Sequence, residues 1–112
     1  MELSSNTVGP VQVVTVHNSR IDAAAAIEFK DAMRVETETE AAIVILHLQE
    51  VTFIDSSGLG AIVAAMKHMG QERSLVLAGL TPAVDKVFRL TRMDRVFGVF
   101  PTLEAALEAH AS

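Results

Sequence analysis

This chain contains no cysteine, no tryptophan and no tyrosine, and five phenylalanines bring its aromatic content to only 4%. Without cysteine, disulfide bonds and thiolate chemistry are excluded. Hydrophobic residues still make up 50% of the sequence, so the core has to be built mainly from Val, Ile, Leu, Ala and Met. This composition favours close α/β packing over aromatic stacking platforms.

Basic residues are also scarce, nine against fourteen acidic ones, which leaves a net charge of −5. A nucleic-acid binder needs cations to neutralise phosphates, so this balance argues against nucleic acid as a direct partner. No apolar run approaches the roughly eighteen residues of a membrane-spanning helix, and the first residues lack the pattern of a signal peptide. We therefore expect no membrane insertion and a cytoplasmic location.

The length of 112 residues suits one domain, 1–112, with a single core. Apolar β-branched runs alternate with segments whose apolar residues recur at helical spacing. The predicted strands are Glu2–Val8, Val11–Val16, Ala42–Leu48, Ser74–Ala78 and Val96–Phe100. The predicted helices are one from Asp22 to about Val35, one from the Ser56-Ser57 pair to about Met69, one starting at Thr81-Pro82, and one carrying Leu103, Ala106 and Leu107. This alternation predicts an α/β fold with a mixed, mostly parallel sheet of four to five strands and about four helices packed on it.

The most informative segment is Phe53–Gly60, in which two hydroxyl side chains stand where a strand gives way to a helix. Ser56 or Ser57 falls at the N-cap or in the first turn, where unpaired N–H groups favour an anion. No Lys follows Gly60 directly, as a phosphate-binding loop requires, and no Gly stands two residues before either Ser, as a hydrolase elbow requires. The segment is therefore interpreted as a phosphoacceptor site, with a plain helix cap as the alternative.

Two glycines, Gly58 and Gly60, fall in the same first turn. Each is expected to cost about 1 kcal/mol of helix propensity relative to Ala. Either the backbone packs closely against a neighbour there, or a partner approaches the turn more closely than a β-carbon would allow.

Four segments together resemble the STAS domain, and specifically the single-domain anti-sigma factor antagonists of bacterial partner-switching systems. They are Ser19–Ala24, Phe53–Gly60, Leu77–Phe97 and Leu103–Leu107. The Asp-Ser-Ser-Gly-Leu-Gly element at 55–60 is the most specific of these motifs. By this resemblance, Ser56 accepts a phosphate. The residues expected to contact the partner are Asp22, Asp55, Ser57, Gly58, Leu59 and Gly60.

The resemblance also implies a function. The unphosphorylated form is expected to bind an anti-sigma factor, commonly a serine protein kinase, and so to release a sigma factor or another output protein. Phosphorylation at Ser56 ends that complex, and a PP2C-type phosphatase reverses the modification. On this interpretation the chain is a substrate of enzymes rather than an enzyme, and it needs no cofactor.

One position departs from the family pattern, because Ser19 stands where the family usually has Gly. The neighbouring Asn18 is able to supply the positive φ, since Asn tolerates the left-handed region; the alternative is a loop before Asp22 that differs in shape from the family's.

Two other functions stay open: a scaffold or ligand-binding STAS subunit, for example of a lipid transporter, and an enzyme that uses Ser56 as its nucleophile. The intact Asp55-Ser56 pair favours regulation, and no local motif supplies a base for that serine. The four histidines show no metal-ligand spacing, so no metal site is expected. The basic series is interpreted as a solvated face, with contact to an acidic partner as the alternative; its members are Lys86, Arg89, Arg92 and Arg95.

Overall fold

A computed structural model describes residues 1–110 and contains a five-stranded sheet with the order β1-β2-β4-β6-β7. Strands β1 (Leu3–Val8) and β2 (Val11–Val16) pair antiparallel, with Gly9 at φ 58° in the turn between them. The other three strands join in parallel: β4 (Ile43–His47), β6 (Ser74–Ala78) and β7 (Val99–Phe100). The predicted mixed, mostly parallel sheet is confirmed.

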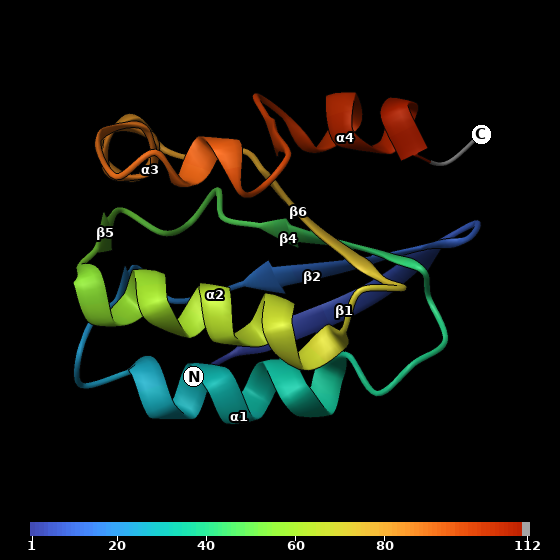
Figure 1. Ribbon diagram of the computed structural model, residues 1–112, viewed down its shortest axis with the longest axis horizontal. Helices are drawn as coiled ribbons and strands as arrows, with labels where there is room; N and C mark the ends of the chain where they lie inside the picture. Colours follow the sequence, from blue (N-terminus) through green and yellow to red (C-terminus); the bar gives the residue numbers. More distant parts are fainter. Residues whose placement is uncertain (111–112) are drawn as a thin grey trace.

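Helices cover both faces of this sheet (Figure 1). Helices α1 (Ala26–Glu36) and α2 (Ser56–Met69) lie side by side on one face, and α4 (Leu103–His110) covers the other. Helix α3 (Pro82–Leu90) lies near the end of the molecule that carries the start of α2. The four predicted helices are all present.

Alternate residues of the central strand β4 enter two hydrophobic cores. Val44 and Leu46 pack in the core beneath α1 and α2, together with Phe29 and Ile62. Ile45 points to the opposite face and packs in the core that includes Ala106 of α4. Burial on both faces explains why this strand is continuously apolar rather than alternating in polarity.

A second, two-stranded parallel sheet was not predicted from the sequence. Strand β3 (Arg20–Ile21) pairs with β5 (Phe53–Ile54), with Ile21 opposite Ile54. Two-residue strands leave no detectable periodicity, because their pairing depends on segments far apart in the chain. The pairing brings the segment after Ile21 against the start of α2, which follows β5 directly.

The prediction that α1 begins with Asp22 as its N-cap is wrong. The N-cap is Ala25, without a side-chain cap, and the helix starts at Ala26. Asp22 instead closes a preceding turn, in which the Ala25 N–H donates to both the carbonyl and the side chain of Asp22, at 3.0 and 3.2 Å. Because the chain leaves β3 at Ile21, this turn has to redirect it before a helix can start.

The predicted strand Val96–Phe100 is shorter than expected. Only Val99–Phe100 pair with β6, and the preceding residues form a 3₁₀ turn, η1 (Met93–Arg95). The N–H groups of Val96 and Phe97 both donate to the Met93 carbonyl at 3.0 Å, so this local turn replaces strand pairing.

Arg92, just before η1, has φ 60° and is the only non-glycine residue with positive φ among residues 1–110. A left-handed conformation costs a side-chain-bearing residue about 1–2 kcal/mol. Asn18, which is able to supply such a conformation, does not adopt it. The Asn18 side-chain Oδ1 accepts a hydrogen bond from the Glu2 N–H at 2.7 Å.

Candidate functional site

Asp55 organises the start of α2, and we call residues 55–60 the serine turn. Asp55 is the N-cap, with φ −110° and ψ −174°, and its Oδ1 accepts a hydrogen bond from the Gly58 N–H at 2.9 Å. Its Oδ2 accepts a second bond, from the Ala23 N–H at 3.1 Å. One carboxylate therefore caps the helix and also fastens it to the turn that follows β3.

Gly58 packs directly against the end of β3. A β-carbon at this position would lie 1.9 Å from the carbonyl oxygen of Ile21 and 2.9 Å from Cγ1 of Ile54. Contacts this short are impossible without moving backbone, so no residue larger than glycine fits at position 58. The first of the two explanations for the glycines, close backbone packing, therefore holds for Gly58.

The other side of the serine turn is open to solvent. Ser56, Ser57 and Gly60 are exposed, and a β-carbon at Gly60 would meet nothing within 4 Å. Within residues 1–110, the hydroxyl and N–H groups of Ser56 and Ser57 have no hydrogen-bond partner. Two hydroxyls and two free N–H groups at a helix N-terminus can accept and stabilise an added anion.

A cation and an aromatic ring flank the turn, and neither was singled out from the sequence. The Arg20 guanidinium lies 4.1 Å from the ring centroid of Phe53, and its Nε donates to Asp22 Oδ2 at 3.2 Å. That hydrogen bond holds the pKa of Asp22 below its ordinary value. Phe53 is 39% exposed. Its exposure follows from the period of a strand, because Ile54 next to it is buried.

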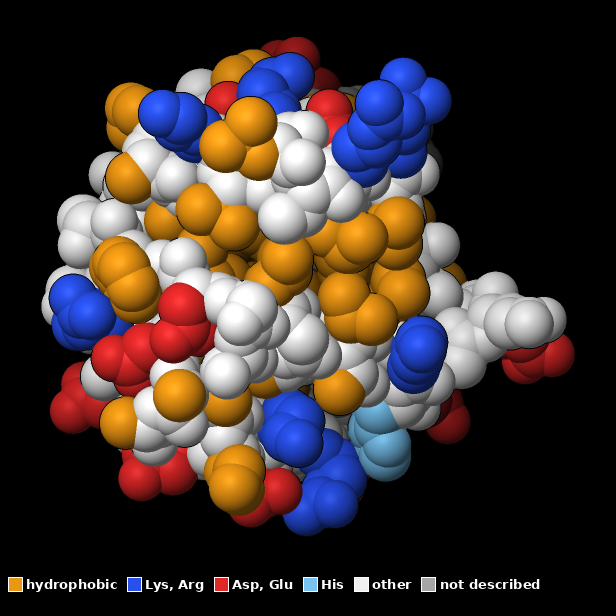
Figure 2. Space-filling view, turned by 60° about the vertical axis from the view of Figure 1, so that its left-hand side comes forward, with side chains coloured by type: hydrophobic (Ala, Val, Ile, Leu, Met, Phe, Trp, Pro, Cys, Tyr) orange, Lys and Arg blue, Asp and Glu red, His pale blue; other side chains and the backbone are white. Residues whose placement is uncertain are grey.

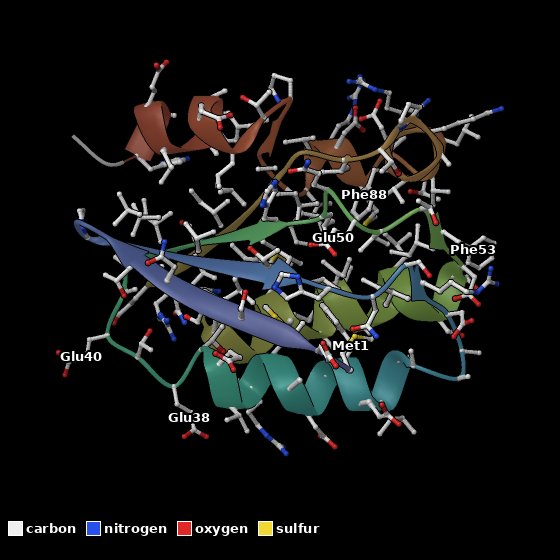
Figure 3. All side chains as sticks on the ribbon, turned by 180° about the vertical axis from the view of Figure 1, so that it is seen from behind. Met1, Glu38, Glu40, Glu50, Phe53 and Phe88 are labelled. Carbon is white, nitrogen blue, oxygen red and sulfur yellow. The ribbon has the colours of Figure 1, made fainter. Side chains whose placement is uncertain are left out.

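The sequence predicts that the acidic segment Glu36–Glu40 is a solvated link that does not contact a partner, and this segment lies far from the serine turn. Figure 3 shows Phe53, two residues before the turn in sequence, at one end of the molecule, and Glu38 and Glu40 at the other. The structure fastens Asp55 to the residue that follows Asp22, through the Ala23 N–H, and it leaves Ser57 and Gly60 accessible. Leu59 is partly buried and Gly58 fully so. Contact of these residues with a partner stays a prediction.

The part of the chain that the structure describes contains neither a cluster of metal ligands nor a membrane-spanning helix. No group of three or more His, Asp or Glu side chains there could hold a metal ion. None of its helices is long and apolar enough to cross a membrane. Within residues 1–110, only His17 forms a hydrogen bond with a serine side chain. It bonds Ser4 at 2.7 Å and Glu50 at 2.8 Å. No histidine in this range bonds Ser56.

Comparison with known proteins gives a consistent result. The family model described as STAS domain matches residues 4–106. A protein of Listeria monocytogenes named anti-sigma-B factor antagonist is 35% identical over 80 residues, which cover 70% of each chain. The crystal structure of an anti-sigma factor antagonist from Mycobacterium paratuberculosis has a TM-score of 0.87 at 26% identity and covers 99% of this chain and 94% of that one.

The same fold also occurs in a different setting. A sulfate transporter family protein from Wolinella succinogenes has a TM-score of 0.74 at 21% identity, with coverage of 89% of this chain and 84% of that one. At this identity the likeness concerns the fold alone.

Proposed function

Because this chain belongs to the STAS domain family, we propose that it is an anti-sigma factor antagonist switched by phosphorylation at Ser56. The unphosphorylated form binds an anti-sigma factor that is also a serine protein kinase. Binding frees a sigma factor or another output protein from that kinase. Phosphorylation of Ser56 ends the complex, and a PP2C-type phosphatase restores the binding form. The chain acts in the cytoplasm, catalyses no reaction itself and uses no cofactor.

The observation that carries this proposal is the two-sided serine turn. Asp55 is held on both carboxylate oxygens and Gly58 is packed against Ile21, so the turn is rigid on its inner side. Ser56 projects from its outer side, exposed and without a hydrogen-bond partner within residues 1–110. A kinase can therefore reach the hydroxyl without unfolding the helix.

The switch acts through charge. A phosphate adds about −1.5 to −2 charge, and the free N–H groups of a helix N-terminus can hold it without disturbing the core. Asp55, the residue next to Ser56, already places negative charge there. Covering the phosphate with a partner then costs several kcal/mol unless the partner supplies a cation. A loss of about 3 kcal/mol lowers affinity by more than a hundredfold.

The test uses two forms of the protein: one carries phosphoserine, introduced genetically, at position 56, and the other is unmodified. Calorimetry against a candidate anti-sigma kinase should give an affinity at least about a hundredfold lower for the phosphorylated form, while circular dichroism stays native. Ser56→Ala should bind constitutively and Ser56→Glu poorly, because one carboxylate only partly imitates a phosphate.

Ser57→Ala is the matched control, since the neighbouring serine is also exposed. It should still be phosphorylated by the kinase. Mass spectrometry that finds the phosphate on Ser57 alone, or full affinity in the phosphorylated form, would contradict the mechanism.

The scaffold or ligand-binding role is the second candidate, because the transporter-associated protein shares this fold. A scaffold does not need an acceptor hydroxyl at position 56, and its binding would be unchanged by phosphoserine there. The same calorimetric comparison therefore separates the two functions.

A further inference from the structure

Exposed apolar side chains from α2 and from the α3–η1 segment meet on one face of the molecule. Figure 2 shows hydrophobic side chains gathered across the middle of this face, with Lys and Arg side chains above and below them and a group of Asp and Glu side chains at the lower left. We call this the apolar surface and define it by Leu59, Val63, Val87, Leu90, Met93 and Val96. Leu90 is 73% exposed and Val96 49%, and exposed apolar side chains that form a contiguous patch mark interaction sites.

The apolar surface lies on the flank of α2 that faces away from α1. The α1-facing flank carries Ala64, Ala65 and His68, which line a cavity together with α1 residues. Leu59 and Val63 lie on the other flank, where α1 cannot cover them, and both are only partly buried. The helices that the structure describes therefore leave the apolar surface uncovered.

The charges along α3 and η1 are unbalanced. Both acidic side chains there form ion pairs with Arg89, with nitrogen–oxygen distances of 2.7 Å to Asp85 and 3.9 Å to Asp94. Lys86, Arg92 and Arg95 are exposed. These three form no ion pair within residues 1–110. A protein with a net charge of −5 thus concentrates unpaired cations beside its apolar surface.

The backbone at Arg92 is a second, independent sign of function. Arg92 follows the C-cap of α3 and has φ 60°, a position where glycine is the residue without a steric penalty. The chain carries a long cation there instead, and strain retained at a surface residue is a pointer to function.

We propose that the apolar surface docks an amphipathic helix of a partner protein, with leucine-like side chains facing it and acidic residues flanking them. Helices bind between helical ridges in this way, with apolar anchors every three to four residues. Opposite charges at the rim guide the approach and fix the orientation. A negatively charged membrane fits less well, because the net charge of the protein opposes it. At Leu59, which also belongs to the serine turn, this surface overlaps the interface of the proposed function, whereas Leu90, Met93 and Val96 lie outside that turn and are tested independently of Ser56.

The experiment uses a synthetic helical peptide with leucine at the anchor positions and glutamate beside them, and a control peptide with lysine in place of glutamate. Fluorescence anisotropy should detect binding of the glutamate peptide only, weakened by added salt. Chemical-shift mapping should place it at Leu90, Arg92 and Val96. Equal binding of the lysine peptide, or shifts confined to other faces, would overturn the proposal.

Two exposed helix residues provide a matched pair of variants. Leu90→Ser should weaken peptide binding by about tenfold or more, because it removes a central anchor. Ile27→Ser on α1, whose side chain is 69% exposed, should leave binding unchanged. An equal effect of the two substitutions contradicts docking at the apolar surface.

Arg92→Gly gives two readouts of opposite sign. Removing the strained side chain should raise the thermal midpoint, and removing the cation should weaken binding of the glutamate peptide by severalfold. A raised midpoint with unchanged peptide binding would show that Arg92 serves no partner.

Binding of anionic phosphatidylserine vesicles through Leu90, or self-association abolished by Leu90→Ser, would assign the surface to a membrane or to a second copy and overturn the proposal.

Discussion

Gly58 and Gly60 stand two residues apart in the same helical turn, yet they face opposite surroundings. Gly58 is buried, and a β-carbon on it would lie 1.9 Å from the Ile21 carbonyl oxygen. Gly60 is exposed, and a β-carbon there would meet nothing within 4 Å. The fold of this chain requires the first glycine and gives no steric reason for the second.

The difference separates two roles within one short motif. The inner side of the serine turn, with Asp55 and Gly58, fixes the helix against β3. The outer side, with Ser56 and Gly60, is free to meet a partner. A helix-weakening glycine on an open surface is accounted for if a partner's backbone approaches there, which is the interpretation that the following substitutions test.

Gly58→Ala should have the largest effect. The added methyl group has to displace the backbone of β3, and overpacking of this kind costs about 3 kcal/mol. Urea denaturation should register the loss as a lower free energy of unfolding. A loss below about 1 kcal/mol would mean that β3 moves easily and that position 58 is not a structural requirement.

Asp55→Ala should have the second-largest effect, lowering the free energy of unfolding by about 2 kcal/mol. It removes the N-cap bond to Gly58 and the bond to the Ala23 N–H. Hydrogen exchange should then speed up at Ala23 as well as at Gly58. If only the Gly58 amide exchanges faster, the tie between the two segments contributes little.

Gly60→Ala should stabilise the protein by about 1 kcal/mol, since alanine favours the helix and has room. Gly60→Leu should also stay folded but weaken binding of the anti-sigma partner, because its side chain occupies the space a partner's backbone would use. Native circular dichroism with undiminished affinity for Gly60→Leu would place the interface elsewhere.

Arg20→Gln should have the smallest effect on stability. Loss of its hydrogen bond should let the pKa of Asp22 rise toward its ordinary value. A carboxyl whose pKa is lowered in the folded state adds stability above its unfolded pKa and loses it as pH falls through the folded value. The variant should therefore lose less stability on acidification than the parent does, and carbon-13 NMR of Asp22 should follow the same change.

Much of the fold could be predicted because it depends on short-range patterns. The continuous apolar run before His47 indicated a strand covered on both faces, and the alternation of strands and helices indicated the mostly parallel sheet. The start of α3 at Thr81-Pro82 was predicted correctly. Thr81 is its N-cap, although the Thr81 hydroxyl donates to the Val51 carbonyl at 2.8 Å and does not cap the helix. The position of the helix start could be predicted there, but the hydrogen-bond partner of the Thr81 side chain could not.

The sequence by itself determined the location of the serine turn, since Asp55, the two serines and the change from strand to helix all lie within a few residues. Only the tertiary structure decided which glycine is structural, because the obstructing atom belongs to Ile21, in a strand distant in sequence. It likewise decided the two-residue β3–β5 pairing and the start of α1 after Asp22. These features depend on which distant backbone groups come into contact, and local periodicity and propensity carry no record of such contacts.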